Sequence, residues 1–316
     1  MNLLTYKGDG GSLFKLYIVN ILLSVITLGI YYPWAKAKLL AYHYSETEMH
    51  GSRFAFLGTG KEMFIGFLKA LLIFGVWYLL FIYFLFQVQL GNSIGFHTSM
   101  MFVMYIVLLL IIPLAIVGSL KYRFSRTTWR GIHMKYTGTV KSMYKVILLG
   151  FLYTVLTFGI YSIWLMIDIR KEITKNIKLG TLEFSFEGRG SKLFGISFFG
   201  YLLSIITLGI YSFQWMANLH NFYINGMRAR IDDERGSFKG TTTGLGFFKL
   251  LIGNFFIVLL TLGLGAPYAL VRSLKYYTSS VELSGNINFD EIKQVEINES
   301  DATGEGFLDA IDLDIV

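Results

Sequence analysis

Cysteine is absent from the sequence, and proline and charged residues are scarce. The absence of cysteine excludes disulfides, thiolate metal sites and a cysteine nucleophile. Charged residues make up only 16% of the chain and hydrophobic residues 54%, whereas a soluble domain carries about a quarter charged residues. A soluble chain with so little charge would expose large apolar patches and aggregate. We therefore expect lipid to be the natural solvent of this protein.

Six long apolar runs fill most of the chain, and each approaches the roughly 20 residues that a helix needs to cross a bilayer. They are Leu13–Trp34, Phe64–Phe86, Ser99–Leu120, Met143–Leu165, Leu193–Trp215 and Phe247–Val271. Between the runs, only the segment Gln87–Thr98 lacks both lysine and arginine. Cytoplasmic loops collect these bases, so six simple crossings would leave basic loops on the wrong side.

A Thr-x-Gly motif recurs within these runs and indicates an internal repeat. It appears as TLGIYYPW from Thr27, TFGIYSIW from Thr157, TLGIYSFQW from Thr207 and TLGLGAPY from Thr261. A more polar helical stretch and a basic patch follow each copy, and then a short segment in which aromatic and polar residues alternate. Such alternation, closed by glycine, is typical of a strand. The predicted strands begin at Arg53, His133, Leu182, Ser237 and Asn286.

The copy between Lys61 and Val140 is enlarged and contains two full-length apolar runs around the base-free loop. It predicts a hairpin with two basic ends on one side of the membrane and its tip on the other. Shorter hairpins in the other copies would place every basic patch on that same side. Leu13 to His43, however, is only about 31 residues, whereas two crossings need about 40. The short hairpins would then be re-entrant, thin the bilayer, or pair a tilted span with an interfacial helix. The alternative is one span per copy, followed by an amphipathic surface helix.

We therefore predict an all-α polytopic membrane protein with short cytoplasmic β-strands. It would consist of about five repeats of strand, glycine link and membrane helical hairpin. The repeats cover approximately 1–57, 58–137, 138–187, 188–240 and 241–289, and together form a single membrane domain, 1–289. We expect a multi-pass topology with the basic loops and both termini cytoplasmic.

Charge is distributed unevenly between this domain and the C-terminal tail 290–316. The tail holds nine acidic residues and one base, Lys293. The whole chain has a net charge of +7, so the rest of the chain, without the tail, has a net charge of about +15. Because the bases flank apolar runs, we expect them to bind anionic lipid headgroups rather than nucleic acid. The acidic tail would dock on the basic loops or on a protein partner. The oligomeric state stays open.

Eight polar residues within or beside the apolar runs are candidates for a polar pathway or for helix packing. They are Asn20, Lys36, Lys38, Asp168, Asn218, His220, Asn254 and Arg272. Small or polar residues, such as Asn20 and Gly150, recur nine residues before each turn glycine. Such residues let membrane helices approach closely, so packing is the simpler interpretation. Ionisable groups inside a membrane are nevertheless candidates for function.

No catalytic, metal or cofactor site is predicted. The five histidines form no recognised zinc spacing. The segment GTGK from Gly58 resembles part of a phosphate loop, but Ala55 and Glu62 stand where that motif requires glycine and serine or threonine. Similar glycine links recur in the other copies, so this one is structural. We expect the protein not to be an enzyme.

The repeated motifs resemble those of the YjgN-like family of bacterial inner-membrane proteins, which carry a domain of unknown function. Gly8–Phe14, Thr27–Trp34 and Gly51–Gly60 are similar to the family pattern, whereas Ile163 and Phe213 stand where that pattern has proline. The resemblance covers nearly the whole chain. It implies location in the bacterial inner membrane and brings no catalytic residues.

Three functions are compatible with these features. A non-catalytic membrane scaffold, sensor or lipid-binding module fits them best. A small-molecule transporter or channel with a polar pathway through the hairpins is the alternative, since repeats with broken, polar helices are common in transporters. A membrane enzyme acting on lipid has no motif to support it.

Overall fold

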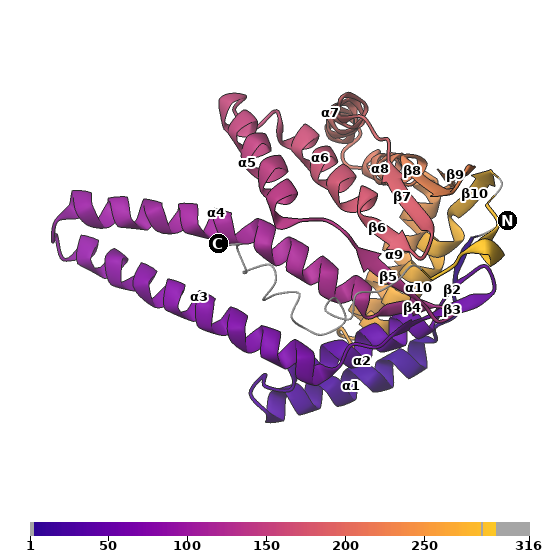
Figure 1. Cartoon of the computed structure of the whole chain (residues 1–316), viewed down its shortest axis with the longest axis horizontal. Helices are drawn as coiled ribbons and strands as arrows, with labels where there is room; N and C mark the ends of the chain where they lie inside the picture. Colours follow the sequence, from indigo (N-terminus) through magenta and orange to yellow (C-terminus); the bar gives the residue numbers. More distant parts are fainter. Residues whose placement is uncertain (1–2, 286, 295–316) are drawn as a thin grey trace.

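The computed structural model describes residues 3–285 and 287–294 (Figure 1), and one order of elements recurs along them. In each of five successive segments a strand leads into two helices joined by a turn, and a second strand follows. The first helices are α1 (Gly10–Ile26), α3 (Gly60–Gln89), α5 (Val140–Leu156), α7 (Gly190–Ile206) and α9 (Gly244–Leu260). The second helices are α2 (Tyr32–Ser45), α4 (Ile94–Ser125), α6 (Ser162–Lys175), α8 (Ser212–Asn225) and α10 (Ala266–Ser279).

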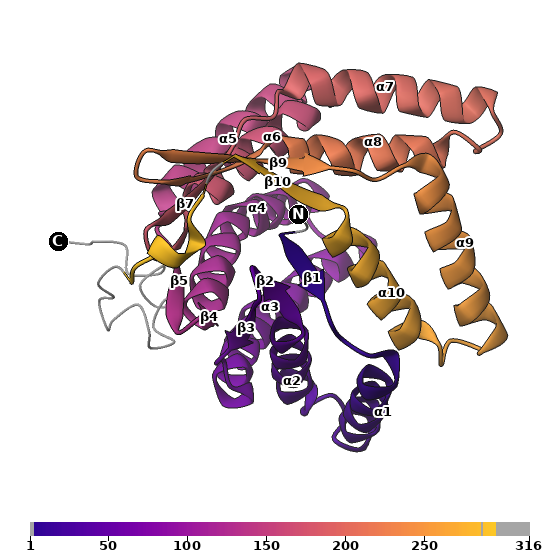
Figure 2. The same cartoon turned by 90° about the vertical axis from the view of Figure 1, so that its right-hand side faces the viewer.

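The strands form one antiparallel sheet in which each strand lies beside its neighbours in sequence. They are β1 (Leu4–Tyr6), β2 (Thr47–Met49), β3 (Ser52–Phe56), β4 (Thr127–Trp129), β5 (Ile132–Tyr136), β6 (Ile177–Leu179), β7 (Leu182–Phe186), β8 (Met227–Ile231), β9 (Glu234–Gly240) and β10 (Val281–Gly285). The two strands that flank a helix pair bond to one another, as β1 does to β2 and β3 to β4. The sheet curls into a nearly closed ring from which the helix pairs radiate (Figure 2). Helix α10 packs against β1 and α1, so the last segment contacts the first.

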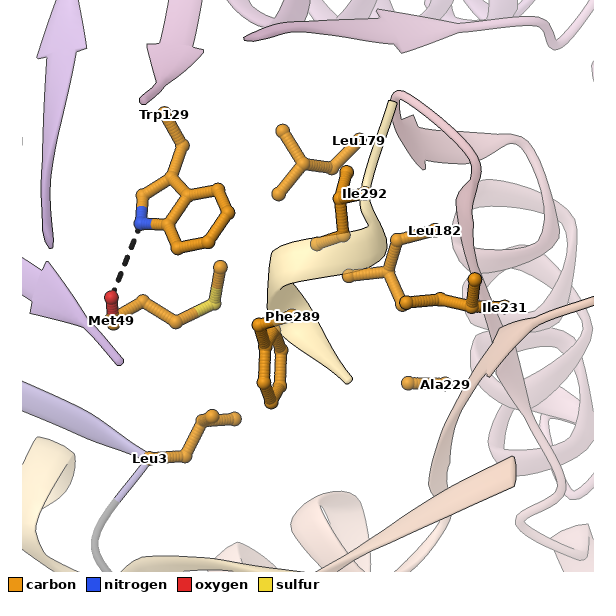
Figure 3. Close-up of a cluster of buried hydrophobic side chains, with 9 residues drawn as sticks. All are labelled: Leu3, Met49, Trp129, Leu179, Leu182, Ala229, Ile231, Phe289 and Ile292. Atoms are coloured by element: carbon orange, nitrogen blue, oxygen red, sulfur yellow. Dashed lines mark hydrogen bonds between the residues drawn. The ribbon is translucent and has the colours of Figure 1, made fainter. Parts of the chain in front are cut away.

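Side chains from all around the ring meet in its centre (Figure 3). Trp129 is 0% exposed, and Leu179 and Leu182 are each 1% exposed. After β10 the chain turns back into this centre through a 3-10 turn, η1 (Phe289–Glu291), and inserts Phe289 and Ile292. The ring is therefore a packed core, and residues 287–294, which we call the plug, are part of it.

The four short helix pairs have equal lengths, with 17 residues in the first helix and 14 in the second. Each first helix ends just before the threonine of a Thr-x-Gly motif, and the glycine of the motif has a positive φ that reverses the chain. Small residues lie where the paired helices touch. Gly150 faces Leu165, and Gly200 faces Trp215. These glycines allow the two backbones to approach closely.

The predicted all-α class is wrong. Ten strands form one continuous sheet. Within residues 3–285 and 287–294, only α3 and α4 are long and apolar enough to cross a membrane. The other four apolar runs are broken at their Thr-x-Gly turns into shorter helices. Alternation in the sequence revealed β3, β5, β7 and β9, but strands of three residues, such as β2, β4 and β6, are too short to show it.

The strand predicted from Asn286 is also wrong. The last strand, β10, lies upstream of it, and the segment from Phe289 forms the turn η1. Phe289 is 5% exposed, so burial in the ring rather than strand pairing fixes this segment. The repeat boundaries proposed from the sequence stay a prediction. Most of the acidic tail, 295–316, lies outside the described residues, and so does its expected docking.

Candidate functional site

The long helix pair α3–α4 presents an apolar surface along most of its length. The most apolar window of α3 is 0% buried, and that of α4 is 17% buried. Trp77 connects the two helices, since its indole Nε1 donates a hydrogen bond to the carbonyl of Met104 at 3.1 Å. Helices that are apolar on all sides are stable only in apolar surroundings. By length and composition, both helices could cross a membrane.

Charged groups gather at the end of this pair that joins the ring. Glu62 caps α3 with Thr59, and its carboxylate accepts a hydrogen bond from Arg126 at 2.6 Å and from the Tyr122 hydroxyl at 3.2 Å. The bases at this end are Lys61, Lys121, Arg123 and Arg126. The opposite end, 87–98, contains neither lysine nor arginine. The pair is thus electrically asymmetric along its axis.

Four predicted pathway residues occupy one register position on the second helices. Lys38, Asp168, Asn218 and Arg272 each stand seven residues before the last residue of their helix. Three of them bond within their own helix or to its N-cap residue: Lys38 to Tyr31 (2.8 Å), Tyr161 to Asp168 (3.1 Å), and Gln214 to Asn218 (2.9 Å). The four residues belong to four helix pairs that diverge from the ring (Figure 2). A shared pathway through them stays a prediction.

Asn254 and Arg272 do come together, across the contact between α9 and α10. The guanidinium of Arg272 donates to the Asn254 Oδ1 at 3.3 Å and to the carbonyl of Lys249 at 2.8 Å. The Asn254 Nδ2 donates to the hydroxyl of Ser273 at 2.8 Å. These bonds link two adjacent helices. His220 takes no part in this contact between α9 and α10. Its Nε2 lies 3.2 Å from the Ser280 hydroxyl.

Asn20 and Lys36 line one open groove between α1 and α2. The groove has a volume of about 550 Å³ and reaches Leu28 at the turn. Asn20 is 4% exposed, and its Nδ2 donates to the carbonyl of Ala35 at 3.4 Å. Its Oδ1 finds no hydrogen-bond partner among the described residues. Asn254 lines a smaller groove of about 360 Å³ on α9.

The plug is a feature that sequence reasoning missed. Residues in or beside all four tight turns between successive segments contact it. The contacts are His50 stacked on Phe289 (5.1 Å between centroids), Arg130 paired with Asp290, Thr181 N donating to the Lys293 carbonyl (3.0 Å), and Asn288 N donating to Glu234 (2.8 Å). The signal that could have revealed it is two apolar residues, Phe289 and Ile292, at the start of an acidic stretch. In residues 3–285 and 287–294, no group of three or more His, Asp or Glu side chains is placed to hold a metal ion.

Comparison with known proteins agrees with the resemblance found in the sequence. The chain belongs to the family described as "Bacterial protein of unknown function (DUF898)", whose model matches residues 2–187, 181–216 and 214–310. The predicted YjgN-like membership is thereby confirmed.

Two curated relatives are both called inner membrane protein YjgN. The one from Salmonella typhimurium is 32% identical over 130 residues, which are 41% of this chain and 30% of the relative. The one from Escherichia coli K12 is 29% identical over 141 residues, which are 45% of this chain and 32% of the relative. The alignments thus span about a third of the length of these relatives. No solved structure matches the chain.

Proposed function

We propose that the protein is a non-catalytic scaffold of the bacterial inner membrane, which holds a plugged β-ring at the cytoplasmic surface and binds anionic lipid around it. The observation that carries this proposal is the long pair α3–α4, whose unburied apolar surface lies between a basic end and a base-free tip. Lysine and arginine mark the cytoplasmic side of membrane helices. The ring would therefore be cytoplasmic. The name of the relatives, inner membrane proteins, supports the location.

The basic ends of the short helix pairs support lipid binding. Lys141 and Lys192 are exposed in the first turns of α5 and α7, close to the ring. Further along, the same two helices expose large apolar side chains, such as Leu152 at 50% and Phe199 at 60%. A base beside an apolar surface complements an anionic headgroup above its acyl chains. We therefore expect a preference for anionic over zwitterionic lipid.

The topology can be tested directly, because the chain has no cysteine of its own. Single cysteines would replace Ser93 at the tip of α3–α4 and Asp233 in the exposed turn between β8 and β9. A membrane-impermeant maleimide should label the Ser93→Cys variant in spheroplasts, in which the inner membrane is intact. It should label the Asp233→Cys variant only in inverted inner-membrane vesicles. Labelling of both variants from one side would refute the proposed membrane hairpin.

Lipid binding needs its own measurement. Native mass spectrometry of the purified protein should show retained phosphatidylglycerol in excess over phosphatidylethanolamine. Replacement of Lys141 and Lys192 by glutamine should reduce that excess, whereas replacement of Lys239, on the ring, should not. Equal retention of both lipids by the parent protein would contradict the lipid-binding part of the proposal.

Transport is the second candidate, and the unpartnered Asn20 Oδ1 beside its groove is the observation in its favour. Packed side chains fill the ring centre, so a pathway would have to run along the helix pairs instead. Reconstituted protein that moves a solute, with the movement abolished in Asn20→Leu, would establish this alternative over the scaffold.

A further inference from the structure

The turns of the four short helix pairs carry one unusual feature in common. The residue after the threonine of each Thr-x-Gly motif is large, apolar and almost fully exposed. These residues are Leu28 (94% exposed), Phe158 (98%), Leu208 (94%) and Leu262 (93%). Each also has a left-handed backbone, with φ of 49°, 52°, 51° and 51° respectively. We call these four residues the tips.

In water, each tip would be unfavourable twice over. A left-handed backbone is strained for a residue such as leucine or phenylalanine, and glycine or asparagine would avoid most of that cost. A fully exposed leucine or phenylalanine also forfeits the stabilisation that its burial would contribute. The same combination occurs at all four turns. Apolar surroundings would leave the backbone cost in place, but burial of the side chain in them would offset it.

The backbone amides of each turn also all donate hydrogen bonds within the protein. In the first turn, the amides of Leu28, Gly29 and Ile30 donate to carbonyls of the same turn or of α1. The next amide, of Tyr31, donates to the Thr27 Oγ1 at 3.0 Å, and Tyr32 donates to the Gly29 carbonyl. The threonine hydroxyl in turn donates to the Leu23 carbonyl at 2.7 Å.

The other three turns repeat this pattern, residue for residue. The threonine Oγ1 accepts from Tyr161 at 3.0 Å, from Tyr211 at 2.9 Å and from Gly265 at 2.6 Å. A non-helical backbone can lie in hydrocarbon only if its polar groups find partners within the protein, since an unpaired group there is strongly unfavourable. The amides of these turns satisfy that condition without water.

The tip of the long pair shares the left-handed backbone, at Ser93 with a φ of 39°, but it differs in its side chains. The turn between α3 and α4 is polar: Asn92 Nδ2 donates to the Gln87 side chain at 2.9 Å, and Ser93 is exposed. Helices of 30 and 32 residues are about 45 Å long, enough to cross the roughly 30 Å hydrocarbon layer and emerge in water. A helix of 17 residues is about 25 Å long and cannot cross from an origin at the ring.

The short pairs differ in direction, and one of them runs across the long pair. In Figure 1 the pair α3–α4 lies in the plane of the view and α7 is seen end-on, whereas in Figure 2 α7–α8 lies in the plane. The pair α7–α8 therefore runs across the direction of the long pair rather than beside it. Where α3–α4 crosses the bilayer, α7–α8 would lie nearer to the plane of the bilayer, so its tip would reach less deep than its length.

We infer that the four short helix pairs are wedges whose tips end inside the hydrocarbon of the cytoplasmic leaflet, and that acyl chains are the ligand of Leu28, Phe158, Leu208 and Leu262. This inference rests on the membrane scaffold proposed above. It makes α3–α4 the sole crossing within residues 3–285 and 287–294. The inserted volume is then unequal between the two leaflets, because the wedges occupy one leaflet only.

The test places single cysteines at Leu28, Phe158, Leu208 and Leu262 in the whole chain, with Ser93→Cys and Asp233→Cys as controls. In inner membranes, an impermeant maleimide should label the tips from neither side, whereas it labels the two controls from opposite sides. A permeant environment-sensitive fluorophore on each tip should then be quenched by lipids that carry a nitroxide on the acyl chain. A water-soluble quencher should also act on the tip labels. It should reduce their emission several-fold less than it reduces the emission of a label at Asp233→Cys.

Two results would overturn the inference and leave the scaffold intact. Labelling of the tips from the periplasmic side would mean that the short pairs cross fully. Labelling from the cytoplasmic side would mean that they lie on the surface in water. Failure of the scaffold itself looks different, because the Ser93 and Asp233 controls would then be labelled from the same side. Four equivalent positions keep the test decisive if one variant does not fold.

Discussion

The indole of Trp129 and the ring of Phe289 lie 6.5 Å apart, edge to face, in the centre of the β-ring. Trp129 belongs to β4, and its Nε1 donates hydrogen bonds to the carbonyls of Met49 (3.2 Å) and Ser52 (3.1 Å). Phe289 comes from the plug, after all ten strands. One aromatic contact thus joins two early β-hairpins to the C-terminal end of the described chain. The ring and the plug are therefore one folding unit.

Replacement of Phe289 by alanine should destabilise the whole ring. Removal of a buried phenylalanine typically costs about 3–5 kcal/mol, since it loses apolar burial and leaves a cavity. The measurement is denaturant unfolding in detergent, followed by the near-ultraviolet circular dichroism of tryptophan. The exposed Asp233→Ala change is the control and should leave the transition in place. An unchanged midpoint for Phe289→Ala would mean that the plug is dispensable.

Two glycines on α7 allow a controlled test of the close contact between α7 and α8. A Cβ atom at Gly200 would overlap the Trp215 indole, whereas a Cβ atom at Gly195 would meet nothing within 4 Å. Alanine favours a helix by up to about 1 kcal/mol over glycine, so Gly195→Ala should be neutral or stabilising. Gly200→Ala should lower the thermal midpoint despite the same gain in propensity. Equal midpoints for the two variants would show that α7 and α8 are not in close contact.

The sequence predicted the local structure well because local signals specify it. The Thr-x-Gly motif at Thr157 correctly marks the end of α5, and the alternation from Leu182 correctly marks β7. Pairing between distant strands carries no such signal. Phe54 lies opposite Trp129 in the sheet, and the whole of α3–α4 separates them in the chain. No local pattern could show that the strands close into a ring.

The candidate site shows the same division between local and distant information. The common register of Lys38, Asp168, Asn218 and Arg272 is present in the sequence. Whether the four residues face one another depends on how far the helix pairs diverge from the ring, which is a property of the sheet. The burial of Phe289 likewise depends on four turns, from His50 to Glu234, that meet only in the folded ring.

Glu183 should make the ring sensitive to acid. Its carboxylate accepts hydrogen bonds from Lys178 and Arg230, both at 2.7 Å, and these two bases hold the pKa of Glu183 below its ordinary value of 4.5. A carboxylate with a lowered folded-state pKa contributes stability that is full above pH 4.5 and is lost as the pH falls below it. The side chains are partly exposed, so the contribution is about 1 kcal/mol at most.

The comparison of Glu183→Gln with the parent protein isolates this contribution from other acidic groups. The parent should have the higher thermal midpoint at pH 7, and the difference should shrink as the pH falls from 5 towards 3. Arg53 forms a more distant pair with Glu46, at 3.6 Å, so Arg53→Gln serves as a control with little effect at any pH. A difference that stays constant with pH would exclude ionisation of Glu183 as its cause.

Thr157 and Thr154 distinguish a wedge in hydrocarbon from a turn in water. Both hydroxyls donate to carbonyls of α5, at 2.7 Å, but only the Thr157 Oγ1 also accepts a hydrogen bond, from the amide of Tyr161 at 3.0 Å. Valine at position 157 leaves that amide without an acceptor, at a cost of about 1–3 kcal/mol where no water can replace it. Valine at position 154 leaves no donor unpaired and should be nearly neutral. Thr157→Ser, which keeps the acceptor, should restore most of the loss. The measurement is thermal unfolding in lipid nanodiscs. If Thr157→Val were as stable there as Thr154→Val, water would have reached the turn, and the tip Phe158 could not lie in the hydrocarbon.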